Sequence, residues 1–379
     1  MVRMKINFLS PTPNLSGGIR VIAIYAAWLK RNGHDVKIYS PVGKRLPLRK
    51  RIKQFITGQG WPVDYDTIAS HFDDIDVEHV VFDKHTFFTN ENIRPADVLV
   101  ATWWETAEWA TKLDSERGAR VYFVQHHEIF DYLPVDRCKA TYLLPFHKIV
   151  VAQWLADVMA EEYSDAHCDL VPNAVNRTLF YAGLRFKQSR PTVGFLCNTT
   201  PLKGLSVALD IVKSLKEIIP NLRVISFAST EPSGQLKIDS SIEVTINPQQ
   251  NSLRDLYAQC DVWLSTSRTE GFNLMAMEAM ACGTPVVSTK TGWPAEAIQD
   301  GINGYLIDID NVEQGSAAAA KILAMTDAEW LAMSGNALKT VEHSSWDNSS
   351  RLFEQALFRA RLRATRGEIF GPCTPITTP

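Results

Sequence analysis

Several features that mark particular classes of protein are missing from this 379-residue sequence. No apolar run approaches the ~20 residues of a membrane-spanning helix, so we expect no spanning segment. The first residues, MVRMKINFLSP, lack the apolar core and cleavage site of a signal peptide, which favours a cytoplasmic protein. The six cysteines form no CxxC pair and no ligand-spaced cluster, which indicates reduced thiols and not a disulfide framework or a zinc site.

An excess of charge of one sign is missing as well. With 39 basic and 42 acidic residues the net charge is −3, so no overall positive field attracts nucleic acid. The one dense basic run is Lys44–Lys53, which carries six basic residues interleaved with apolar ones. It predicts either a solvated surface or a peripheral contact with anionic lipid at the inner face of a membrane.

The length and the repeated local pattern predict two α/β domains. A chain of this size is too long for one ordinary domain. Residues 4–9 read as a strand, a glycine-containing loop follows, apolar residues then recur at helical spacing, and residues 35–39 read as the next strand. The same order of strand, loop, helix and strand restarts at residue 192 and ends near residue 227. Two such openings half a chain apart predict two doubly wound parallel sheets.

The expected boundaries follow from this pattern. Residues 170–190, which are polar and contain a Val-Pro-Asn turn, form the expected hinge. The last helical pattern should pack back across the domain junction, and the tail after it, rich in proline and threonine, should be loose. The predicted parts are an N-terminal Rossmann-like domain (1–175), a C-terminal Rossmann-like domain (176–345), a crossover helix (346–366) and a flexible tail (367–379).

The most informative segment is Asp261–Val287. A buried strand there ends in a polar turn and leads into a helix that begins near Asn273, whose exposed amides favour an anion. Glu270 precedes the helix start, and Glu278 lies about a turn and a half inside it, where a carboxylate can accept hydrogen bonds from a ribose diol. The more common alternative for isolated glutamates is that Glu278 is a solvated helix residue and that Glu270 interacts only with the helix dipole.

The wider context favours the ligand-binding alternative. The stretch TEGFNLMAMEAMACGTPVV closely resembles the donor-binding signature of glycosyltransferase family 4, in which two glutamates are separated by seven residues. The linker VPNAVN and the pair Lys203-Gly204 resemble further elements of that family, so that the resemblance covers roughly residues 4–345. It implies a GT-B fold of two facing Rossmann-like domains and a retaining, nucleotide-sugar-dependent enzyme that binds the donor mainly in its second domain and the acceptor in its first.

The resemblance also implies roles for individual residues. Glu270 would contact the donor sugar, Glu278 the ribose, and Lys203 the diphosphate. Backbone amides would contact sugar and phosphate from opposite sides of a cleft. The donor-binding residues implied are Gly17, Gly18, Asn198, Thr199, Lys203, Arg268, Gly271, Phe272, Asn273, Leu274 and Glu278.

Two departures from the family pattern affect this site. Asn198 stands where the family usually carries an arginine, and Arg268, Arg20 or Thr199 would have to replace that charge. Gly292-Trp293 replaces a common Gly-Gly pair, which would reshape the floor of the sugar pocket. Gly17-Gly18 does not fit the spacing of a dinucleotide fingerprint, which disfavours a nicotinamide cofactor.

Aromatic and histidine residues supply the remaining candidates. His126 and His127 follow a predicted strand, and because neighbours on an extended chain face opposite ways, a shared metal is not expected. The family places a histidine near the donor sugar here; His126 is the better-aligned candidate, with His127 assigned to the acceptor, although either one is open to a structural role. Trp103 and Trp104 fit stacking on an acceptor sugar and plain packing equally well.

The resulting hypothesis is a metal-independent retaining glycosyltransferase in which Glu270, His126 and Lys203 are the catalytic group. It would move a hexose from a UDP-sugar to a hydroxyl of a saccharide or lipid-linked saccharide, in surface or exopolysaccharide synthesis. No cofactor and no metal are expected, since cationic side chains and helix ends can stabilise the leaving diphosphate. The alternatives are a UDP-sugar epimerase or hydrolase of the same fold and a non-catalytic nucleotide-sugar-binding protein, which the missing arginine at Asn198 keeps open.

Overall fold

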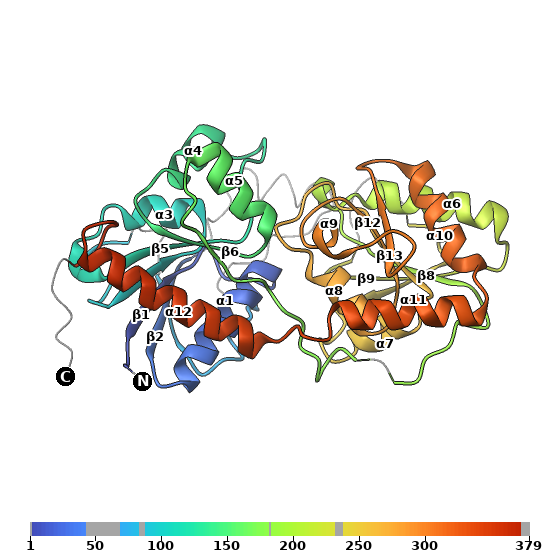
Figure 1. Cartoon of the computed structure of the whole chain (residues 1–379), viewed down its shortest axis with the longest axis horizontal. Coiled ribbons are helices and arrows are strands. Elements are labelled where there is room, and N and C mark those ends of the chain that lie inside the picture. The colour runs from blue at the N-terminus through green and yellow to red at the C-terminus, as the bar shows by residue number, and fades with distance from the viewer. Residues whose placement is uncertain (1, 43–68, 83–87, 182, 232–237, 373–379) are drawn as a thin grey trace, which may run out of the picture. The chain divides into compact units, whose positions relative to one another are not determined.

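The computed structural model describes residues 2–42, 69–82, 88–181, 183–231 and 238–372. The chain divides into two compact units. Unit 1 comprises Met1–Pro172 together with Asp347–Pro379, and unit 2 is the continuous stretch Asn173–Trp346. Each unit is an α/β structure built on a parallel sheet with helices on both faces (Figure 1), which confirms the predicted fold class.

In its described residues, unit 1 has a seven-stranded sheet in the order β3-β2-β1-β4-β5-β6-β7. Its strands are β1 (Lys5–Leu9), β2 (Asp35–Pro41), β3 (Glu78–Phe82), β4 (Val98–Ala101), β5 (Ala119–Val124), β6 (His147–Val150) and β7 (Asp169–Leu170). Its helices are α1 (Gly17–Arg31), α3 (Trp104–Ala110), the short 3-10 helix η2 (Ser115–Arg117), α4 (Val135–Tyr142), α5 (Gln153–Tyr163) and α12 (Trp346–Thr365). The central strands β4, β5 and β6 are buried along their whole length, as expected for a parallel sheet covered on both faces.

Helix α12 belongs to unit 1, although it comes last in the sequence. Phe353 on this helix stacks on Tyr25 of α1 with ring centroids 4.4 Å apart, and its ring also contacts Phe8 and Phe123. Nearby, His34 Nε2 lies 2.7 Å from Glu354 Oε1 in a buried pair. The helix therefore completes the core of the first unit, as the predicted return of the last helix to the first domain requires.

In its described residues, unit 2 has a six-stranded parallel sheet in the order β10-β9-β8-β11-β12-β13. The strands are β8 (Thr192–Leu196), β9 (Arg223–Ala228), β10 (Ile242–Ile246), β11 (Val262–Ser265), β12 (Val286–Thr289) and β13 (Gly304–Ile307). The helices are η3 (Pro201–Lys203), α6 (Leu205–Ile218), α7 (Leu253–Ala258), α8 (Leu274–Ala281), α9 (Pro294–Ala297), α10 (Val312–Ala324) and α11 (Asp327–Thr340). Apolar residues of α6, α10 and α11 form one core with the inner residues of these strands.

The strand order reverses once in each sheet, and this reversal locates the ligand-binding edge. The reversal lies between β1 and β4 in unit 1 and between β8 and β11 in unit 2. Open parallel sheets bind ligands in the crevice outside the carboxyl ends of the strands at such a point. Lys203 and Glu270 lie in the segments that follow β8 and β11. These two predicted site residues therefore lie at the carboxyl edge where the strand order reverses.

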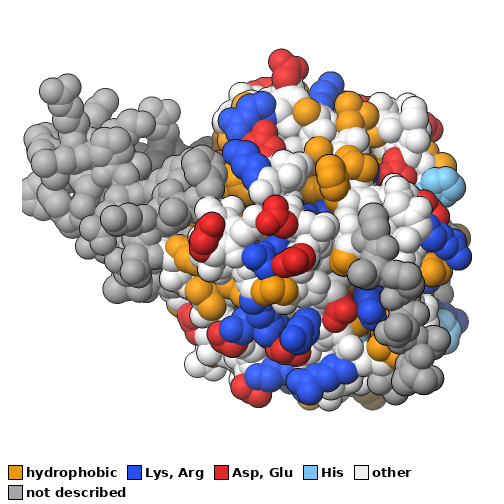
Figure 2. All heavy atoms as spheres, turned by 90° about the vertical axis from the view of Figure 1, so that its left-hand side faces the viewer, with side chains coloured by type: hydrophobic (Ala, Val, Ile, Leu, Met, Phe, Trp, Pro, Cys, Tyr) orange, Lys and Arg blue, Asp and Glu red, His pale blue; other side chains and the backbone are white. Residues whose placement is uncertain are grey.

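Charged side chains of both signs are interspersed on the side of the molecule drawn in Figure 2. Within unit 1, two arginines of α12 form ion pairs: Arg359 lies 2.8 Å from Asp169, and Arg361 lies 3.2 Å from Asp97. The basic run Lys44–Lys53 lies outside the described residues, and its predicted membrane contact stays a prediction. Within the described ranges, no helix is both long enough and apolar enough to cross a bilayer.

Candidate functional site

Two loops of unit 2 are fastened together at the carboxyl edge of its sheet. Gly204 has a left-handed backbone (φ 63°), and a side chain there would overlap the carbonyl oxygen of Thr266. The hydroxyl of Thr266 in turn donates to the Gly204 carbonyl at 2.9 Å, and the amide of Arg268 donates to the Leu202 carbonyl at 2.8 Å. Glycine is required at this position because no other residue permits so close an approach of two backbones.

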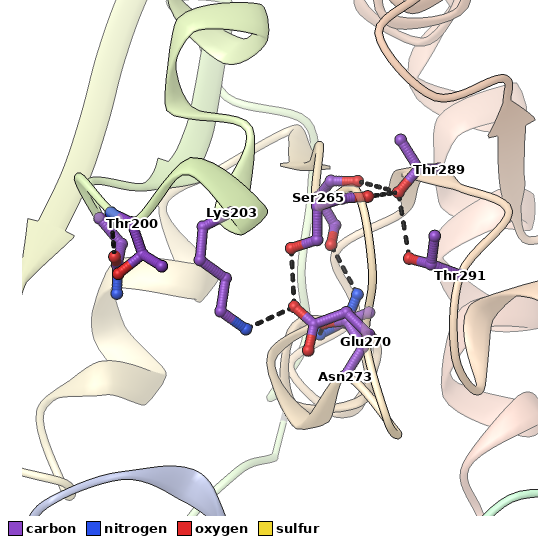
Figure 3. Close-up of polar contacts among 10 residues, drawn as sticks. Thr200, Lys203, Ser265, Glu270, Asn273, Thr289 and Thr291 are labelled. Atoms are coloured by element: carbon purple, nitrogen blue, oxygen red, sulfur yellow. Dashed lines mark hydrogen bonds and ion pairs between the residues drawn. The ribbon is translucent and has the colours of Figure 1, made fainter. Parts of the chain in front are cut away.

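This close approach brings Lys203 next to Glu270 (Figure 3). Lys203 Nζ lies 2.6 Å from Glu270 Oε1, and the hydroxyl of Ser267 donates to the same oxygen at 2.6 Å. The Lys203 side chain is 27% exposed and the Glu270 side chain 10% exposed. Within the described part of the chain, Glu270 Oε2 takes no hydrogen bond, and Figure 3 shows it turned away from these partners. One carboxylate oxygen is therefore anchored, and the other can accept a hydrogen bond from a ligand.

The loop that carries Glu270 is supported from behind by the end of β12. Thr289, fully buried, donates its hydroxyl to the Ser267 carbonyl at 2.6 Å. Gly292 has φ 62°, and a Cβ there would lie 3.0 Å from Glu270 Cβ and 2.8 Å from the Phe272 carbonyl oxygen. The ring of Trp293 stacks on Phe272 with centroids 5.9 Å apart. The Gly292-Trp293 pair thus lies directly against Glu270 and Phe272, where the sequence predicts the floor of a sugar pocket.

Helix α8 begins where the sequence predicts it. Asn273 is the N-cap residue, with a left-handed backbone (φ 77°) that asparagine tolerates better than most residues. Its Oδ1 accepts from the Ala276 amide at 3.3 Å, and its Nδ2 donates to Ser265 Oγ at 2.7 Å. The first amides of the helix, from Leu274 onward, add a partial positive charge a few residues after Glu270.

Glu278 lies one turn after Leu274 on α8 and is only 2% exposed. Its Oε2 accepts a hydrogen bond from the Tyr257 hydroxyl at 3.1 Å. The alternative that Glu278 is a solvated surface residue is therefore wrong. A carboxylate buried on a helix beside the ligand-binding edge is compatible with the predicted ribose contact, which stays a prediction.

The candidates in unit 2 for replacing the missing arginine have defined local contacts. Asn198 Oδ1 accepts from the Thr200 amide at 2.9 Å and closes a turn, while Thr199 is exposed. Arg268, one predicted substitute, has its Nε 2.8 and 2.9 Å from the two carboxylate oxygens of Asp310. This exposed ion pair holds Arg268 toward Asp310, and its predicted replacement of the missing arginine stays a prediction.

In unit 1, the predicted glycines lie at the point where the strand order reverses. Gly17 and Gly18 begin α1, and the carbonyl of Gly18 accepts a hydrogen bond from Gln125 Nε2 at 3.2 Å. Gln125 comes directly after β5, so this contact joins the loops that follow β1 and β5. Arg20, the other candidate charge, lies on the first turn of α1 and is half-buried.

The two adjacent histidines have different environments, and one prediction needs correction. His126 is half-buried, with Nδ1 3.0 Å from the His127 carbonyl. His127 is buried, its Nε2 lies 2.7 Å from the Tyr163 hydroxyl, and burial lowers its pKa. Since its ring is enclosed by protein, the structure argues against His127 as an acceptor contact, and of the pair only His126 reaches the surface.

The two predicted acceptor-site tryptophans, Trp103 and Trp104, also differ in burial. Trp104 is buried, and the Arg137 guanidinium lies 5.0 Å from its ring centroid. Packing is therefore the better interpretation of Trp104, whose ring is not available to stack on an acceptor. Trp103 is half-buried as the residue that precedes α3, and its predicted acceptor role stays a prediction.

A buried carboxyl group that the sequence reasoning missed lies behind these residues. Glu128 Oε2 accepts from the Trp104 amide at 2.8 Å and from the Tyr122 hydroxyl at 3.3 Å. Burial raises the pKa of Glu128 to about 8. The Tyr142 hydroxyl accepts from the Glu128 amide at 2.8 Å and donates to the His126 carbonyl at 3.2 Å. This network fixes the loops after β4 and β5 relative to each other.

Across the residues that the structure describes, no three His, Cys, Asp or Glu side chains gather closely enough to hold a metal ion. Two sequence strings, residues 74–76 and 308–310, resemble an Asp-x-Asp metal motif. They have cationic partners: Asp76 pairs with Lys30, Asp308 with Lys290 and Asp310 with Arg268. The expected independence from metal ions stays a prediction.

Comparison with known proteins finds a family similarity in the second unit. Residues 190–325 match the family model described as "Glycosyl transferases group 1". The match covers little more than a third of the chain and lies within unit 2. Within the group 1 segment lie Lys203, Glu270, Glu278 and Trp293, whereas His126 and Gly17-Gly18 lie outside it.

Curated relatives carry the name D-inositol 3-phosphate glycosyltransferase. The protein from Segniliparus rotundus is 30% identical over 175 residues, which is 41% of this chain and 39% of the relative. The protein from Rhodococcus opacus is 31% identical over 172 residues, which is 42% of this chain and 38% of the relative. The match thus spans about two fifths of the length of either relative.

Solved structures share the fold over nearly the whole chain. HepE of Anabaena in complex with UDP-glucose has a TM-score of 0.69 at 16% identity, covering 94% of this chain and 100% of that chain. WaaG, a glycosyltransferase involved in lipopolysaccharide biosynthesis, has a TM-score of 0.63 at 15% identity, covering 93% and 98%. Together with the group 1 match, these neighbours confirm the predicted resemblance and the GT-B fold class.

Proposed function

We propose that this protein is a glycosyltransferase that moves a hexose from a UDP-sugar to a hydroxyl of a saccharide or lipid-linked saccharide, with retention of anomeric configuration. The observation that carries the proposal is the Lys203–Glu270 pair at the switch point of unit 2. A lysine amine and a carboxylate with one anchored oxygen stand there beside the start of α8. A sugar diphosphate presents the matching chemistry, because it combines hydroxyl donors with negative charge.

Each group has a defined task in this proposal. Glu270 Oε2 accepts hydrogen bonds from donor-sugar hydroxyls, while Ser267 and Lys203 hold Oε1. Lys203 and the first amides of α8 stabilise the diphosphate, since a cation and a helix N-terminus both favour an anion. The ammonium group of Lys203 has three N–H donors. One can therefore stay bonded to Glu270 while the others donate to phosphate oxygens.

The reaction itself requires little proton chemistry from the protein. As the bond between C1 and the diphosphate oxygen breaks, negative charge develops on the diphosphate, and Lys203 and the helix amides stabilise it. The acceptor hydroxyl attacks C1 from the face that the diphosphate leaves, and its proton passes to a phosphate oxygen. The products are the glycosylated acceptor and UDP. Glu270 positions the sugar and stabilises the positive charge that develops near C1; it forms no covalent intermediate.

Names of similar proteins support the donor and leave the acceptor open. A fold neighbour was solved with UDP-glucose, and the curated relatives are named for D-inositol 3-phosphate. A role in surface or exopolysaccharide synthesis, and a membrane-surface contact through Lys44–Lys53, are further parts of the proposal.

The test begins with a thermal-shift panel of UDP, GDP, ADP and TDP and their common sugar conjugates. We expect a nucleotide diphosphate, UDP first, to raise Tm by several degrees at saturating concentration, because a ligand that binds only the folded state stabilises it. Sugar consumption with and without added acceptors then separates transfer from hydrolysis or epimerisation. No shift with any nucleotide contradicts the proposal.

A pair of variants separates an enzyme from a binding protein. Glu270→Gln keeps the size of the side chain but removes its charge, and we expect turnover to fall about 100-fold or more while UDP still raises Tm. Glu243→Gln is the matched control, since it disrupts another ion pair of unit 2, with Arg223 at 2.7 Å, on an edge strand. Equal activity of the two variants rules out the role assigned to Glu270.

A further inference from the structure

An aromatic surface follows β5 at the ligand-binding edge of unit 1. The rings of Phe130 and Tyr132 stack with centroids 5.4 Å apart and an angle of only 8° between their planes. Tyr132 is 70% exposed, which makes it the most exposed aromatic side chain in the described part of the chain, and Phe130 is half-buried. Because the two rings are stacked on each other, Tyr132 presents the face that points away from Phe130 to solvent, and Phe130 supports it from behind.

This surface continues to the predicted catalytic histidine. The Phe130 ring lies 4.9 Å from the His126 ring, and the His126 ring lies 5.9 Å from that of Trp154 at the start of α5. We call these four residues, His126, Phe130, Tyr132 and Trp154, the aromatic platform. It extends from the one predicted catalytic residue of unit 1 out to an exposed tyrosine.

Backbone hydrogen bonds hold the platform in shape. The Ile129 amide donates to the His127 carbonyl at 2.9 Å, and the Leu133 amide donates to the Phe130 carbonyl at 2.8 Å. The Tyr142 hydroxyl holds the His126 carbonyl from below at 3.2 Å. A ligand that binds here loses little free energy to ordering of the loop, because the turn is already formed.

The charges around the platform select the kind of ligand. The turn from Ile129 to Pro134 contains Asp131 but no lysine or arginine, and α5 is likewise without either. Of the two basic residues of the following helix, Arg137 is bound to Glu108 at 2.5 Å and Lys139 is exposed to solvent. These surroundings disfavour a phosphorylated acceptor or an anionic lipid headgroup, which basic side chains would be needed to bind.

We propose that the aromatic platform binds a neutral pyranose ring of the acceptor, with the apolar face of the sugar stacked on Tyr132, which Phe130 supports, and its reactive hydroxyl near His126. The inference rests on the proposed glycosyltransferase function and adds the acceptor class and its contact residues. Aromatic rings suit this task because they provide a rigid apolar face with few rotatable bonds. The platform takes the acceptor role that the sequence assigned to the buried Trp104 and His127.

The kinetic test uses p-nitrophenyl glucoside, galactoside and mannoside as neutral acceptors and glucose 6-phosphate as a charged one. We expect Tyr132→Ala and Phe130→Ala to raise KM for the preferred neutral acceptor roughly 5- to 10-fold, the scale of one aromatic contact. Tyr132→Phe keeps the ring and should stay within about twofold. Phe186→Ala, which removes a 58% exposed aromatic residue from unit 2, is the matched control and should change nothing.

A binding measurement without turnover separates this inference from the proposed function. Saturation-transfer NMR with the methyl glycosides of the same sugars reports contact directly, and the UDP thermal shift reports the donor site. Loss of glycoside contact in Tyr132→Ala with an unchanged UDP shift supports the platform, and it does so even if no UDP-sugar is consumed. An unchanged glycoside signal and KM in both alanine variants overturns the platform while leaving the donor site intact. Preference for glucose 6-phosphate over the neutral glycosides also overturns it. So does a result in which the alanine variants lose binding to phosphatidylglycerol vesicles and not binding to glycosides.

Discussion

Replacing Ser267 with alanine removes one of the two groups that anchor Glu270 Oε1. The Ser267 hydroxyl donates to this oxygen at 2.6 Å, and the residue is buried, so water cannot readily replace the bond. A hydrogen bond to a charged group contributes about 1.5 to 3 kcal/mol. If Lys203 retains part of that anchoring, about 1.4 kcal/mol of transition-state stabilisation is lost, which corresponds to roughly a tenfold decrease in kcat.

A second serine provides the control for this experiment. Ser334 on α11 is also buried, and its hydroxyl donates to the Gly283 carbonyl at 2.6 Å, away from Glu270. Both Ser267→Ala and Ser334→Ala should lower Tm by a few degrees, but only the first should lower kcat. Initial rates of UDP release, measured beside thermal denaturation, give both quantities, and Ser267→Thr should restore much of the rate because it restores the hydroxyl.

The role assigned to Ser267 is refuted if the two alanine variants lose the same small amount of activity, or if Ser267→Ala raises only KM for the UDP-sugar. The first result would mean that Ser267 is merely structural. The second would mean that Glu270 and its anchor contribute equally to ground-state and transition-state binding, which contradicts its placement beside the sugar.

Three further predictions concern stability. Gly204→Ala should lower the free energy of unfolding by more than about 2 kcal/mol, because alanine is strained at φ 63° and its Cβ would overlap a backbone oxygen. The control Gly335→Ala lies in a helix with open space around it and should be neutral or stabilising. Urea denaturation measures both. Phe353→Ala should cost about 3 to 5 kcal/mol because this ring is fully buried, and the exposed neighbour variant Leu352→Ala should cost far less. The pKa of Glu128 rises from 4.5 to about 8 in the folded state, so the free energy of unfolding should fall as pH rises across that interval, by an amount on the order of 4 kcal/mol, and then level off. Glu128→Gln removes this slope; parallel wild-type and variant curves between pH 5 and 8.5 would contradict the assignment.

The sequence was most informative where local pattern and topology agree. The strand, loop and helix pattern of residues 4–29 predicts β1 and α1, the pattern from residue 192 predicts β8 and α6, and the final helix was expected over nearly the residues of α12. Hydrophobic periodicity reports which face of an element is buried, and glycine-rich loops report where it ends. That information fixes parallel sheets and their carboxyl edges, from which the location of Lys203 and Glu270 follows.

Contacts between segments far apart in the chain were not accessible in the same way. Thr289 supports Ser267 from a strand 22 residues later, and Glu128 caps a helix that begins 24 residues earlier. Nothing in the local sequence around these residues distinguishes them from ordinary polar residues near strand ends. Which of His126 and His127 points into the core likewise could not be read from the local sequence. It is decided by packing, because the His127 ring contacts the rings of Tyr142 and Tyr163.

The position of α12 has a consequence for how the chain reaches its native state during synthesis. Unit 2 is a continuous stretch and has all its residues once Trp346 has left the ribosome, whereas unit 1 still lacks the ring of Phe353 between β1, α1 and β5. We therefore expect the second half of the chain to acquire native structure first and the first half to wait, with part of its aromatic interior uncovered. Proteolysis of ribosome-bound chains from which residues up to 346 have emerged should then yield a protected fragment from unit 2 and rapid cleavage within unit 1.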